Sequence, residues 1–501
     1  MKYDYIIDYL CSTAGPQIDG AGSSDERVNK RVEAGIAESL RRYICGVDGD
    51  EGNDYFRADQ SGLLYIYNGK FFERMNDIKF LGIIREVLRR KDVGIVYIMD
   101  SAKRIADYCI ESLMQERKCQ FNPNRRYVCF NNCVLDLQTM KVMEHDFRYC
   151  TDIIMNFDYD VDARSALWDS VISQTVPDEG MRKSYQQFCG AFLIDRTVHK
   201  FEYICFLVGE GQNGKSIVAK ALVNVFKNED ENGVPVTKCI TTYTPEQLFK
   251  SNQMDYHMAE VNGKIMNYCD DVSDKDFSGG DFKAFVSGGE FTGRAPYSKE
   301  PTYVTKIPIM LCCANKIPPT TDDSDGYFRR FLIINCPNKV SERDRDPQLE
   351  SKLRDNKVRA AIFNWMIEGY QDLLRNDCKI EMSESVKAMK EDMKADSNSA
   401  RRWIREYNYV AVTPTSLSDP RWKPLREWMT IYQQYCKEYG EMPKTAKSVS
   451  KIFEDLGFEK DRRSSGTWFC IGVAEPKEEK KSVIEDRGVF GLANDDGDIP
   501  F

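Results

Sequence analysis

The residues whose types and spacing point most clearly to a chemical role are eight consecutive ones: Gly209, Glu210, Gly211, Gln212, Asn213, Gly214, Lys215 and Ser216. They follow an apolar run, Tyr203 to Val208, and precede a helical pattern, Ile217 to Phe226. This is the strand, loop and helix order of a P-loop, whose backbone N–H groups surround phosphate oxygens at the start of the helix. Lys215 would reach the β- and γ-phosphates, and the Ser216 hydroxyl would hold Mg²⁺. The pattern therefore predicts a site for a nucleoside triphosphate, with a plain glycine-rich turn as the alternative.

Two acidic residues end the next apolar strand that follows the P-loop helix. This strand, Lys264 to Cys269, runs into Asp270 and Asp271. In phosphoryl transfer, one acid serves the water shell of the metal ion and another the attacking water. We assign Asp270 to Mg²⁺ and Asp271 to the water, although the two roles could be exchanged. A surface turn is the alternative explanation for paired acids of this kind.

A further apolar strand, within Ile307 to Pro319, stops on the polar residue Asn315. A buried strand that delivers one amide beside the γ-phosphate can orient the nucleophilic water through a hydrogen bond. Asn315 is therefore a third catalytic candidate, after Lys215 and the acidic pair.

Length and composition narrow the class of protein. The 501 residues suffice for about three domains of ordinary size. A net charge of -9 argues against a uniformly basic surface, so any nucleic-acid contact must be local or made by a ring of subunits. The 17 cysteines and 3 histidines lack zinc-site spacing, and we expect reduced, mostly buried thiols. No signal peptide or long apolar span indicates secretion or membrane insertion.

Four stretches of the sequence, together with their order, resemble one family: NNCVLDLQTMKV, CTDIIMNFDYD, YQQFCGAFLIDR and GEGQNGKS. They are similar to the amino-terminal region and ATPase core of the poxvirus and phage helicase-primase family, within the superfamily-3 helicases. The resemblance spans about residues 60 to 410. It implies an α/β fold with an AAA+-like P-loop ATPase core, and ATP with Mg²⁺ as the bound group. It also implies a homo-hexamer that encircles DNA.

The resemblance assigns roles to further residues. In this family Asn315 corresponds to the sensor asparagine. Arg329 or Arg330 corresponds to the arginine finger, which is inserted into the site of the neighbouring subunit. There its guanidinium neutralises charge on the γ-phosphoryl group. The sequence does not say which arginine acts, and a salt-bridged pair at a strand edge is the alternative. Residues 279 to 300 correspond to a segment ending in a channel hairpin. In this segment Arg294, Tyr297 and Lys299 are the candidate DNA contacts. A solvated loop without a role in DNA binding is the alternative interpretation.

The segments outside the core carry weaker signals. A hairpin turned at Asn68-Gly69 bears aromatic residues that either stack on bases or, as is commoner, form core and cross-strand pairs. We divide the chain into an amino-terminal element and flexible tether (1–30), an N-terminal α+β domain (31–126), a helicase-primase-type collar region (127–195), the P-loop ATPase core (196–345), a helical lid (346–412), a winged helix (413–474) and a disordered acidic tail (475–501).

The carboxyl-terminal region suggests two further contacts. Two helical patterns and a hairpin turned at Ser-Ser-Gly predict the winged helix, in which Lys447, Arg462 and Arg463 would contact DNA phosphates. A protein-docking wing is the competing interpretation. The chain ends in Asp498, Ile499, Pro500 and Phe501, which resemble the acidic tip of bacterial single-stranded-DNA-binding proteins. This resemblance implies docking of host replication proteins, through an apolar ring, a terminal carboxylate and nearby acids.

Taken together, the sequence predicts a ring-forming, ATP-dependent helicase that translocates on single-stranded and forked DNA in phage or mobile-element replication. The expected location is the cytoplasm of a bacterial host, without membrane attachment. A primase-helicase is one alternative, although residues 1 to 126 show no convincing arrangement for two-metal nucleotidyl transfer. An origin-binding initiator that uses ATP without processive unwinding is the other.

Overall fold

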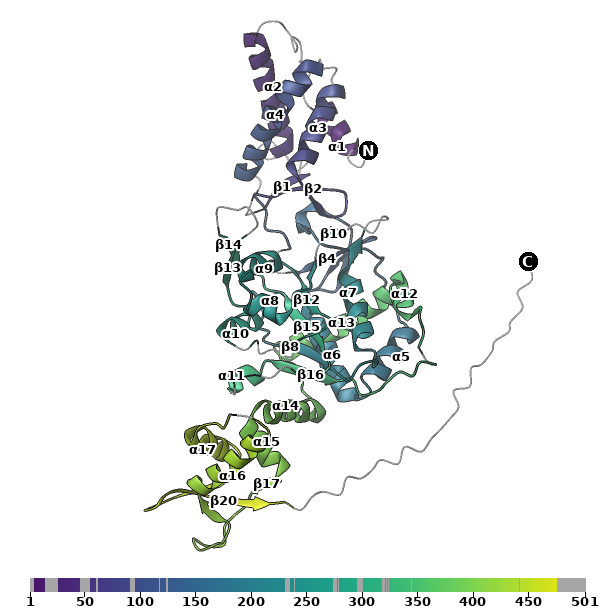
Figure 1. The fold of residues 1–501 in the computed structure, drawn as a ribbon. Helices are drawn as coiled ribbons and strands as arrows, with labels where there is room; N and C mark the ends of the chain where they lie inside the picture. Colours follow the sequence, from purple (N-terminus) through teal and green to yellow (C-terminus); the bar gives the residue numbers. More distant parts are fainter. Residues whose placement is uncertain are drawn as a thin grey trace, which may run out of the picture. The chain divides into compact units, whose positions relative to one another are not determined.

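The protein is represented by a computed structural model that divides into two compact units, Met1–Lys394 and Ala395–Phe501 (Figure 1). The second unit begins before the predicted lid ends, so residues 395 to 412 belong with the predicted winged helix. The structure describes residues 4–13, 26–45, 55–59, 62–90, 95–116, 118–122, 125–229, 235–237, 239–273, 277, 279–294, 301–317, 320, 322, 324–343, 345–440 and 442–474.

Helices and a small sheet form the amino-terminal part of the first unit. The elements are α1 (Asp4–Thr13), α2 (Glu26–Cys45), β1 (Phe56–Ala58), β2 (Leu64–Tyr67), β3 (Phe72–Met75), α3 (Asp77–Arg90) and α4 (Ile95–Glu116). Strands β2 and β3 pair in antiparallel fashion, which confirms the hairpin at Asn68-Gly69. Its aromatic residues are buried, as Tyr67 and Phe72 show with ring centroids 5.3 Å apart, so the core interpretation holds over base stacking. The predicted tether is wrong for residues 26 to 30, which already belong to α2.

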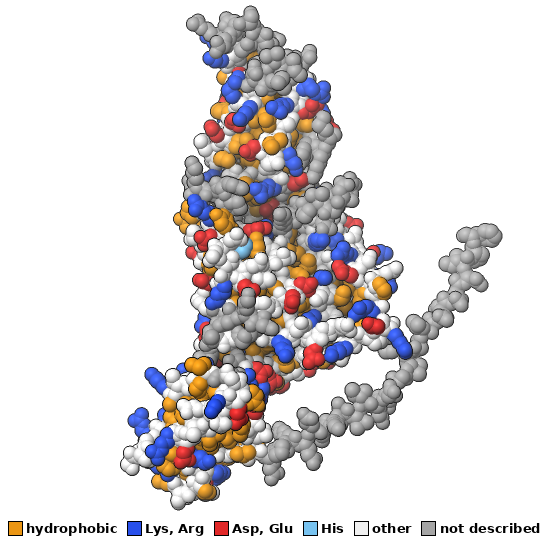
Figure 2. All heavy atoms as spheres, viewed as in Figure 1, with side chains coloured by type: hydrophobic (Ala, Val, Ile, Leu, Met, Phe, Trp, Pro, Cys, Tyr) orange, Lys and Arg blue, Asp and Glu red, His pale blue; other side chains and the backbone are white. Residues whose placement is uncertain are grey.

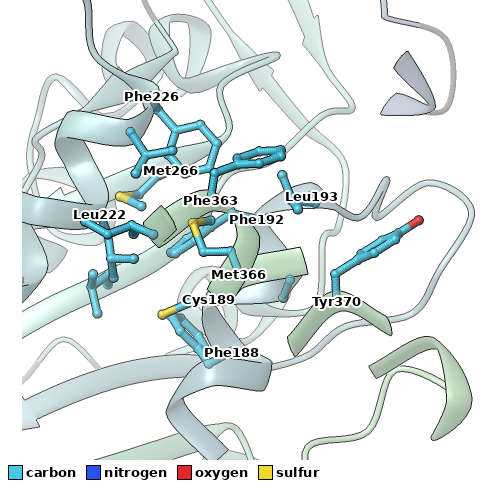
Figure 3. Close-up of a cluster of buried hydrophobic side chains, with 14 of the residues drawn as sticks. Phe188, Cys189, Phe192, Leu193, Leu222, Phe226, Met266, Phe363, Met366 and Tyr370 are labelled. Carbon is cyan, nitrogen blue, oxygen red and sulfur yellow. The ribbon is translucent and has the colours of Figure 1, made fainter. Parts of the chain in front are cut away.

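A second sheet and a pair of helices lead into the predicted core. The elements are β4 (Tyr127–Phe130), β5 (Val134–Asp136), β6 (Lys141–Met143), η2 (Phe147–Tyr149), β7 (Ile154–Met155), α5 (Ala166–Thr175), α6 (Glu179–Gly190) and η3 (Ala191–Leu193). The four strands take the order β6-β5-β4-β7. The apolar side chains of α6 and η3 meet those of α13 (Asn356–Arg375) in one buried cluster, as the sticks of Phe188, Phe192, Phe363 and Met366 show (Figure 3).

Helices α6 and α13 cross where each has a glycine. A Cβ atom added at Gly190 would lie 2.1 Å from the backbone nitrogen of Tyr370. A Cβ atom added at Gly369 would lie 2.1 Å from the carbonyl oxygen of Gln186. The two backbones therefore approach more closely than any residue with a side chain would allow.

We expect Gly190→Ala to lower the free energy of unfolding by about 3 kcal/mol, because the methyl group must push backbone atoms apart. Gly82 is the matched control, since it also lies within a helix but a Cβ atom there would meet nothing within 4 Å. Gly82→Ala is expected to raise the stability by up to about 1 kcal/mol. Urea unfolding of the full chain, followed by circular dichroism, measures both. Equal effects of the two substitutions would contradict the close crossing.

A five-stranded parallel sheet forms the centre of the first unit, with the order β11-β12-β15-β8-β16. Its strands are β8 (Ile204–Val208), β11 (Ile240–Thr241), β12 (Met266–Cys269), β15 (Ile309–Ala314) and β16 (Phe331–Asn335). Alternate side chains of β8 enter different cores, with Cys205 and Leu207 in one and Ile204 and Phe206 in the other. Both faces are thus covered, which explains why the strands read as continuous apolar runs.

Helices cover the two faces of this sheet. Residues of α7 (Lys215–Phe226) and α13 share one core with the sheet, and residues of α8 (Pro245–Phe249), α9 (Met254–Val261) and α10 (Gly280–Val286) share the other. The remaining elements of the unit are β9 (Asn228–Glu229), β10 (Pro235–Thr237), β13 (Phe291–Gly293), β14 (Thr302–Val304), α11 (Asp325–Phe328) and α12 (Leu349–Leu353). The sheet is therefore the scaffold on which the predicted site residues are placed.

The second unit has its own core. Helix α14 (Glu384–Ser397) spans the division, and α15 (Ser399–Glu406), β17 (Tyr409–Ala411), β18 (Trp422–Pro424), α16 (Leu425–Glu438), α17 (Ala446–Asp455), β19 (Glu459–Arg463) and β20 (Gly466–Val473) follow. The buried residues Trp403, Trp428 and Phe453 are central to it. Strands β19 and β20 form the predicted hairpin, with Arg463 paired to Gly466 across the turn. Two helices followed by a hairpin are thus confirmed as elements.

All seventeen cysteines lie in described parts of the chain and none of them pairs with another in a disulfide. Most are buried in the cores, and Cys11 and Cys150 are partly exposed. Among the helices that the structure describes, none combines the length and apolar character needed to traverse a bilayer.

Candidate active site

The predicted phosphate loop connects the carboxyl end of β8 to the start of α7. Gly211, Gln212 and Gly214 have positive φ angles of 77°, 53° and 77°, so the backbone turns tightly ahead of the helix. A Cβ atom at Gly214 would lie 2.6 Å from the hydroxyl oxygen of Thr175, which further restricts this position to glycine. No side chain caps the first turn of α7. Its N–H groups are thus available to an anion, and the helix dipole favours negative charge there.

Lys215 is buried at the base of this loop, with 8% of its surface exposed. Its Nζ donates to the carbonyl oxygen of Gly209 at 2.7 Å and to Oδ1 of Asn315 at 3.0 Å. Asn213 lies 3.4 Å away through Oδ1 and is itself fixed by a 2.6 Å bond from Nδ2 to the carbonyl oxygen of Cys336. The structure therefore brings Lys215 and Asn315 together although they lie a hundred residues apart, because β15 pairs directly with β8.

The two acidic candidates follow β12, which is the next strand beyond β15. Partial burial acts to raise the pKa of the Asp270 carboxyl, but hydrogen bonds from Tyr268 and Ser216 outweigh this effect. The pKa of Asp270 is therefore lowered. The Tyr268 hydroxyl lies 2.5 Å from Oδ1 of Asp270. Both acids are exposed, and the side chain that reaches Ser216 is that of Asp270, whereas the backbone oxygen of Asp271 accepts a hydrogen bond from Cys269. A hydroxyl and a carboxylate that meet in this way are the hard oxygen ligands that Mg²⁺ prefers.

The arginine pair, Arg329 and Arg330, lies at the amino ends of the parallel strands, opposite the carboxyl ends where the predicted phosphate loop lies. The carbonyl oxygen of Arg330 accepts a 2.8 Å hydrogen bond from the N–H of Ile204, at the start of β8. The predicted phosphate loop follows Val208 at the other end of the same strand, and five residues of strand span about 16 Å. Both arginines therefore lie too far along the strand to reach a phosphate bound at the predicted loop of the same chain.

The two arginines differ in their surroundings. Arg330 is 8% exposed, and its guanidinium donates to the Ser287 hydroxyl at 2.8 and 3.2 Å and to the carbonyl oxygen of Gly326. Burial lowers its pKa, and the positive charge of Arg329 adds to this effect. The side chain of Arg329 is 57% exposed and lies 3.4 Å from the carboxylate of Glu202. Only one member of the pair is thus presented to the surface.

The predicted channel hairpin is described only at its base. Strands β13 and β14 pair in antiparallel fashion, and Gly293 packs against the backbone of α9. Arg294 is exposed, and its N–H donates to the carbonyl oxygen of Asp255 at 3.0 Å. Tyr297 and Lys299 lie outside the described residues, so their contact with DNA stays a prediction.

The basic residues of the second unit are not equivalent. Lys447 on α17 and Arg462 on β19 are exposed. The guanidinium of Arg463 instead lies 4.3 Å from the ring centroid of Trp468 and 5.1 Å from that of Trp422. Its Nε donates to Asp461 at 2.8 Å. Arg463 therefore joins the hairpin to β18, whereas Lys447 and Arg462 keep their charge towards solvent.

We expect Arg463→Ala to destabilise the second unit by about 2 kcal/mol, because two cation–π contacts and an ion pair are lost together. Arg462→Ala is the matched control on the same strand and should leave the melting temperature within about 1 °C, since the substitution is at the surface. Differential scanning calorimetry of the full chain measures both. If Arg463→Ala melts like the wild type, the sandwich between the two tryptophans contributes nothing.

Acidic and basic side chains are interspersed on the face of the molecule drawn in Figure 2. This distribution agrees with a net charge of -9 and with contacts to nucleic acid that are local. The predicted docking tip, Asp498 to Phe501, lies outside the described residues and stays a prediction.

Sequence reasoning missed three residues at these sites. Tyr268 and Lys220 both contact Asp270, at 2.5 and 3.6 Å. Lys220 follows Ser216 by one helical turn, so helical spacing alone could have identified it. Glu202 contacts both arginines, at 3.4 and 4.0 Å, and no local pattern in the sequence indicates this because the contact depends on the pairing of β16 with β8.

Comparison with known proteins gives partial matches. The family model described as "D5 N terminal like" matches residues 38–177, and the one described as "Family of unknown function (DUF5906)" matches residues 207–330. The chain is 23% identical over 248 residues to the protein named "Putative helicase 121R" of Invertebrate iridescent virus 3. This alignment covers 47% of the chain and 25% of the viral protein, so the chain spans about a quarter of this curated relative.

Among solved structures, two apo structures of the NrS-1 C-terminal region are similar to the chain. Their TM-scores are 0.47 and 0.45, with sequence identities of 14% and 13%. The alignments cover 83% and 84% of this chain and 96% of each NrS-1 chain.

Proposed function

We propose that the chain is an ATP-dependent DNA helicase that acts in phage or mobile-element replication as a ring of identical subunits. The observation that carries this proposal is the convergence of Lys215, Asn315 and Asp270 at the carboxyl edge of one parallel sheet. Ligands of open α/β sheets bind at this edge. The match to the D5 N terminal like model and the similarity to a viral protein named as a helicase support a replication enzyme.

The residues of the loop would divide the work of hydrolysis. The first-turn N–H groups of α7 and the Nζ of Lys215 would bind the β- and γ-phosphates, and Lys215 would exchange the carbonyl oxygen of Gly209 for a phosphate oxygen. Mg²⁺, held by Ser216 and Asp270, would neutralise charge on the phosphates. The Asn315 amide, already fixed beside Lys215 by a 3.0 Å bond, would orient the attacking water. Asp271 would accept the proton of that water.

Completion of the site requires a second subunit. Arg329 lies at the opposite edge of the sheet from its own P-loop and is exposed, so it would serve the nucleotide of a neighbour. A head-to-tail contact of this type closes into a ring if the rotation between subunits closes. We propose a hexamer, in which Arg294 and the hairpin beyond it face single-stranded DNA. Lys447 and Arg462 of the second unit would contact duplex phosphates at the fork.

The test is displacement of a labelled strand from a forked duplex by the wild-type chain. We expect displacement that requires both ATP and Mg²⁺, together with hydrolysis that single-stranded DNA stimulates. Hydrolysis without displacement would overturn the helicase assignment in favour of an initiator ATPase. Failure to bind a fluorescent ATP analogue would overturn the nucleotide site itself.

A further inference from the structure

Lys220 lies beside the acid assigned to the metal. It follows Ser216 by one turn of α7, and its Nζ is 3.6 Å from Oδ2 of Asp270. The other carboxylate oxygen, Oδ1, already accepts a 2.5 Å hydrogen bond from the Tyr268 hydroxyl. Both carboxylate oxygens therefore contact side chains of the protein itself, and Lys220 is the cation among these donors, which also include the hydroxyls of Tyr268 and Ser216.

We propose that Lys220 is a positioning residue that occupies Oδ2 of Asp270 in the nucleotide-free protein and opposes the binding of a divalent cation there. The proposal rests on the metal site of the proposed function. A cation entering between Ser216 and Asp270 must displace the ammonium group or tolerate it within a few ångströms. Because both charges are positive, Lys220 weakens binding of the bare metal ion.

The size of the effect follows from the exposure of the pair. The side chains of Lys220 and Asp270 are 38% and 47% exposed, so solvent and salt screen their interaction. Removal of the ammonium charge should therefore tighten binding of a divalent ion to the nucleotide-free protein by about fivefold, well below the value expected for a buried pair. Phosphate oxygens of a bound nucleotide would offset the repulsion, because they supply negative charge and additional ligands together.

This role gives the site an order of events. A divalent ion that arrives alone meets the Asp270 carboxylate already paired with the Lys220 ammonium group. An ion that arrives with a nucleotide brings phosphate oxygens, whose negative charge offsets the repulsion from Lys220. Lys220 therefore favours loading of metal and nucleotide as one unit. An ion pair that merely anchors α7 to the end of β12 would instead alter stability and leave metal affinity unchanged.

The experiment titrates Mn²⁺, as a spin probe for the metal, into the nucleotide-free full chain and follows free Mn²⁺ by electron paramagnetic resonance. We expect Lys220→Met to bind Mn²⁺ about fivefold more tightly than the wild type, and Lys220→Arg to restore the wild-type affinity because it keeps the charge. Lys379→Met, at an exposed position after α13, should match the wild type. Asp270→Asn should weaken binding in the wild-type and the Lys220→Met background alike.

Unchanged or weaker Mn²⁺ binding by Lys220→Met, with a melting temperature equal to that of the wild type, would overturn the inference. Mn²⁺ binding that survives Asp270→Asn would overturn it as well, because the ion would lie elsewhere. Binding of a fluorescent ATP analogue by the wild type is measured in parallel. Its failure defeats the proposed function, whereas normal ATP binding with no change in Mn²⁺ affinity defeats only the role of Lys220.

Discussion

Lys215→Ala should reduce the rate of ATP hydrolysis by at least about 10²-fold and abolish strand displacement. The Nζ of Lys215 is held at the base of the loop by its 3.0 Å bond to Asn315, and it would exchange only the 2.7 Å bond to the Gly209 carbonyl oxygen for a phosphate oxygen. A charge fixed before reaction needs no reorganisation at the moment of bond cleavage. Release of inorganic phosphate in the steady state measures the rate, and the forked duplex measures displacement.

Two controls separate this role from a general loss of structure. Lys379→Ala removes an exposed lysine and should hydrolyse ATP like the wild type. Lys215→Arg keeps the positive charge but replaces the compact ammonium group between Asn213 and Asn315 with a planar guanidinium of different hydrogen-bond geometry, and this variant should be nearly inactive. Hydrolysis by Lys215→Ala at more than a tenth of the wild-type rate, with unchanged melting, would contradict the assigned role.

The local elements of the site were predictable because their signals are local. The change from an apolar run to a helical pattern marks the boundary between β8 and α7, and glycines mark the loop between them. Strands β12, β15 and β16 were identifiable as apolar runs because both faces of the sheet are covered. The order of the strands was not predictable from periodicity. That order places Asn315 beside Lys215 and leaves Arg329 and Arg330 at the far edge.

The differences between neighbouring residues required the tertiary structure. Arg329 and Arg330 are identical in type and adjacent in sequence, yet only Arg330 is buried, where its guanidinium donates to the Ser287 hydroxyl that follows α10. In the same way, the sequence alone predicts a surface cation at Arg463. The tertiary structure instead places its guanidinium in contact with the rings of Trp422 and Trp468. Residues 26 to 30 read as tether because they are polar, yet they extend α2 by more than a turn.

The arginine pair gives the second large prediction. Arg329→Ala should lower ATP hydrolysis by about 10³-fold with little change in stability, because an exposed guanidinium that completes a neighbour's site contributes to the rate and little to the fold. Arg330→Ala should instead lower the free energy of unfolding by about 3 kcal/mol, since it removes a buried side chain together with its hydrogen bonds to Ser287 and Gly326. Phosphate release and urea unfolding, measured on both variants, distinguish the two outcomes.

Mixing two inactive variants tests whether Arg329 acts between subunits. Subunits with Arg329→Ala retain an intact P-loop, and subunits with Lys215→Ala retain an intact arginine. In a ring assembled in random order from equal amounts of the two variants, about a quarter of the contacts would combine the intact P-loop of the first with the intact arginine of the second, so about a quarter of the wild-type hydrolysis should return. A mixture as inactive as its components would exclude a finger at Arg329, because the distance along β8 already excludes action on the chain's own nucleotide.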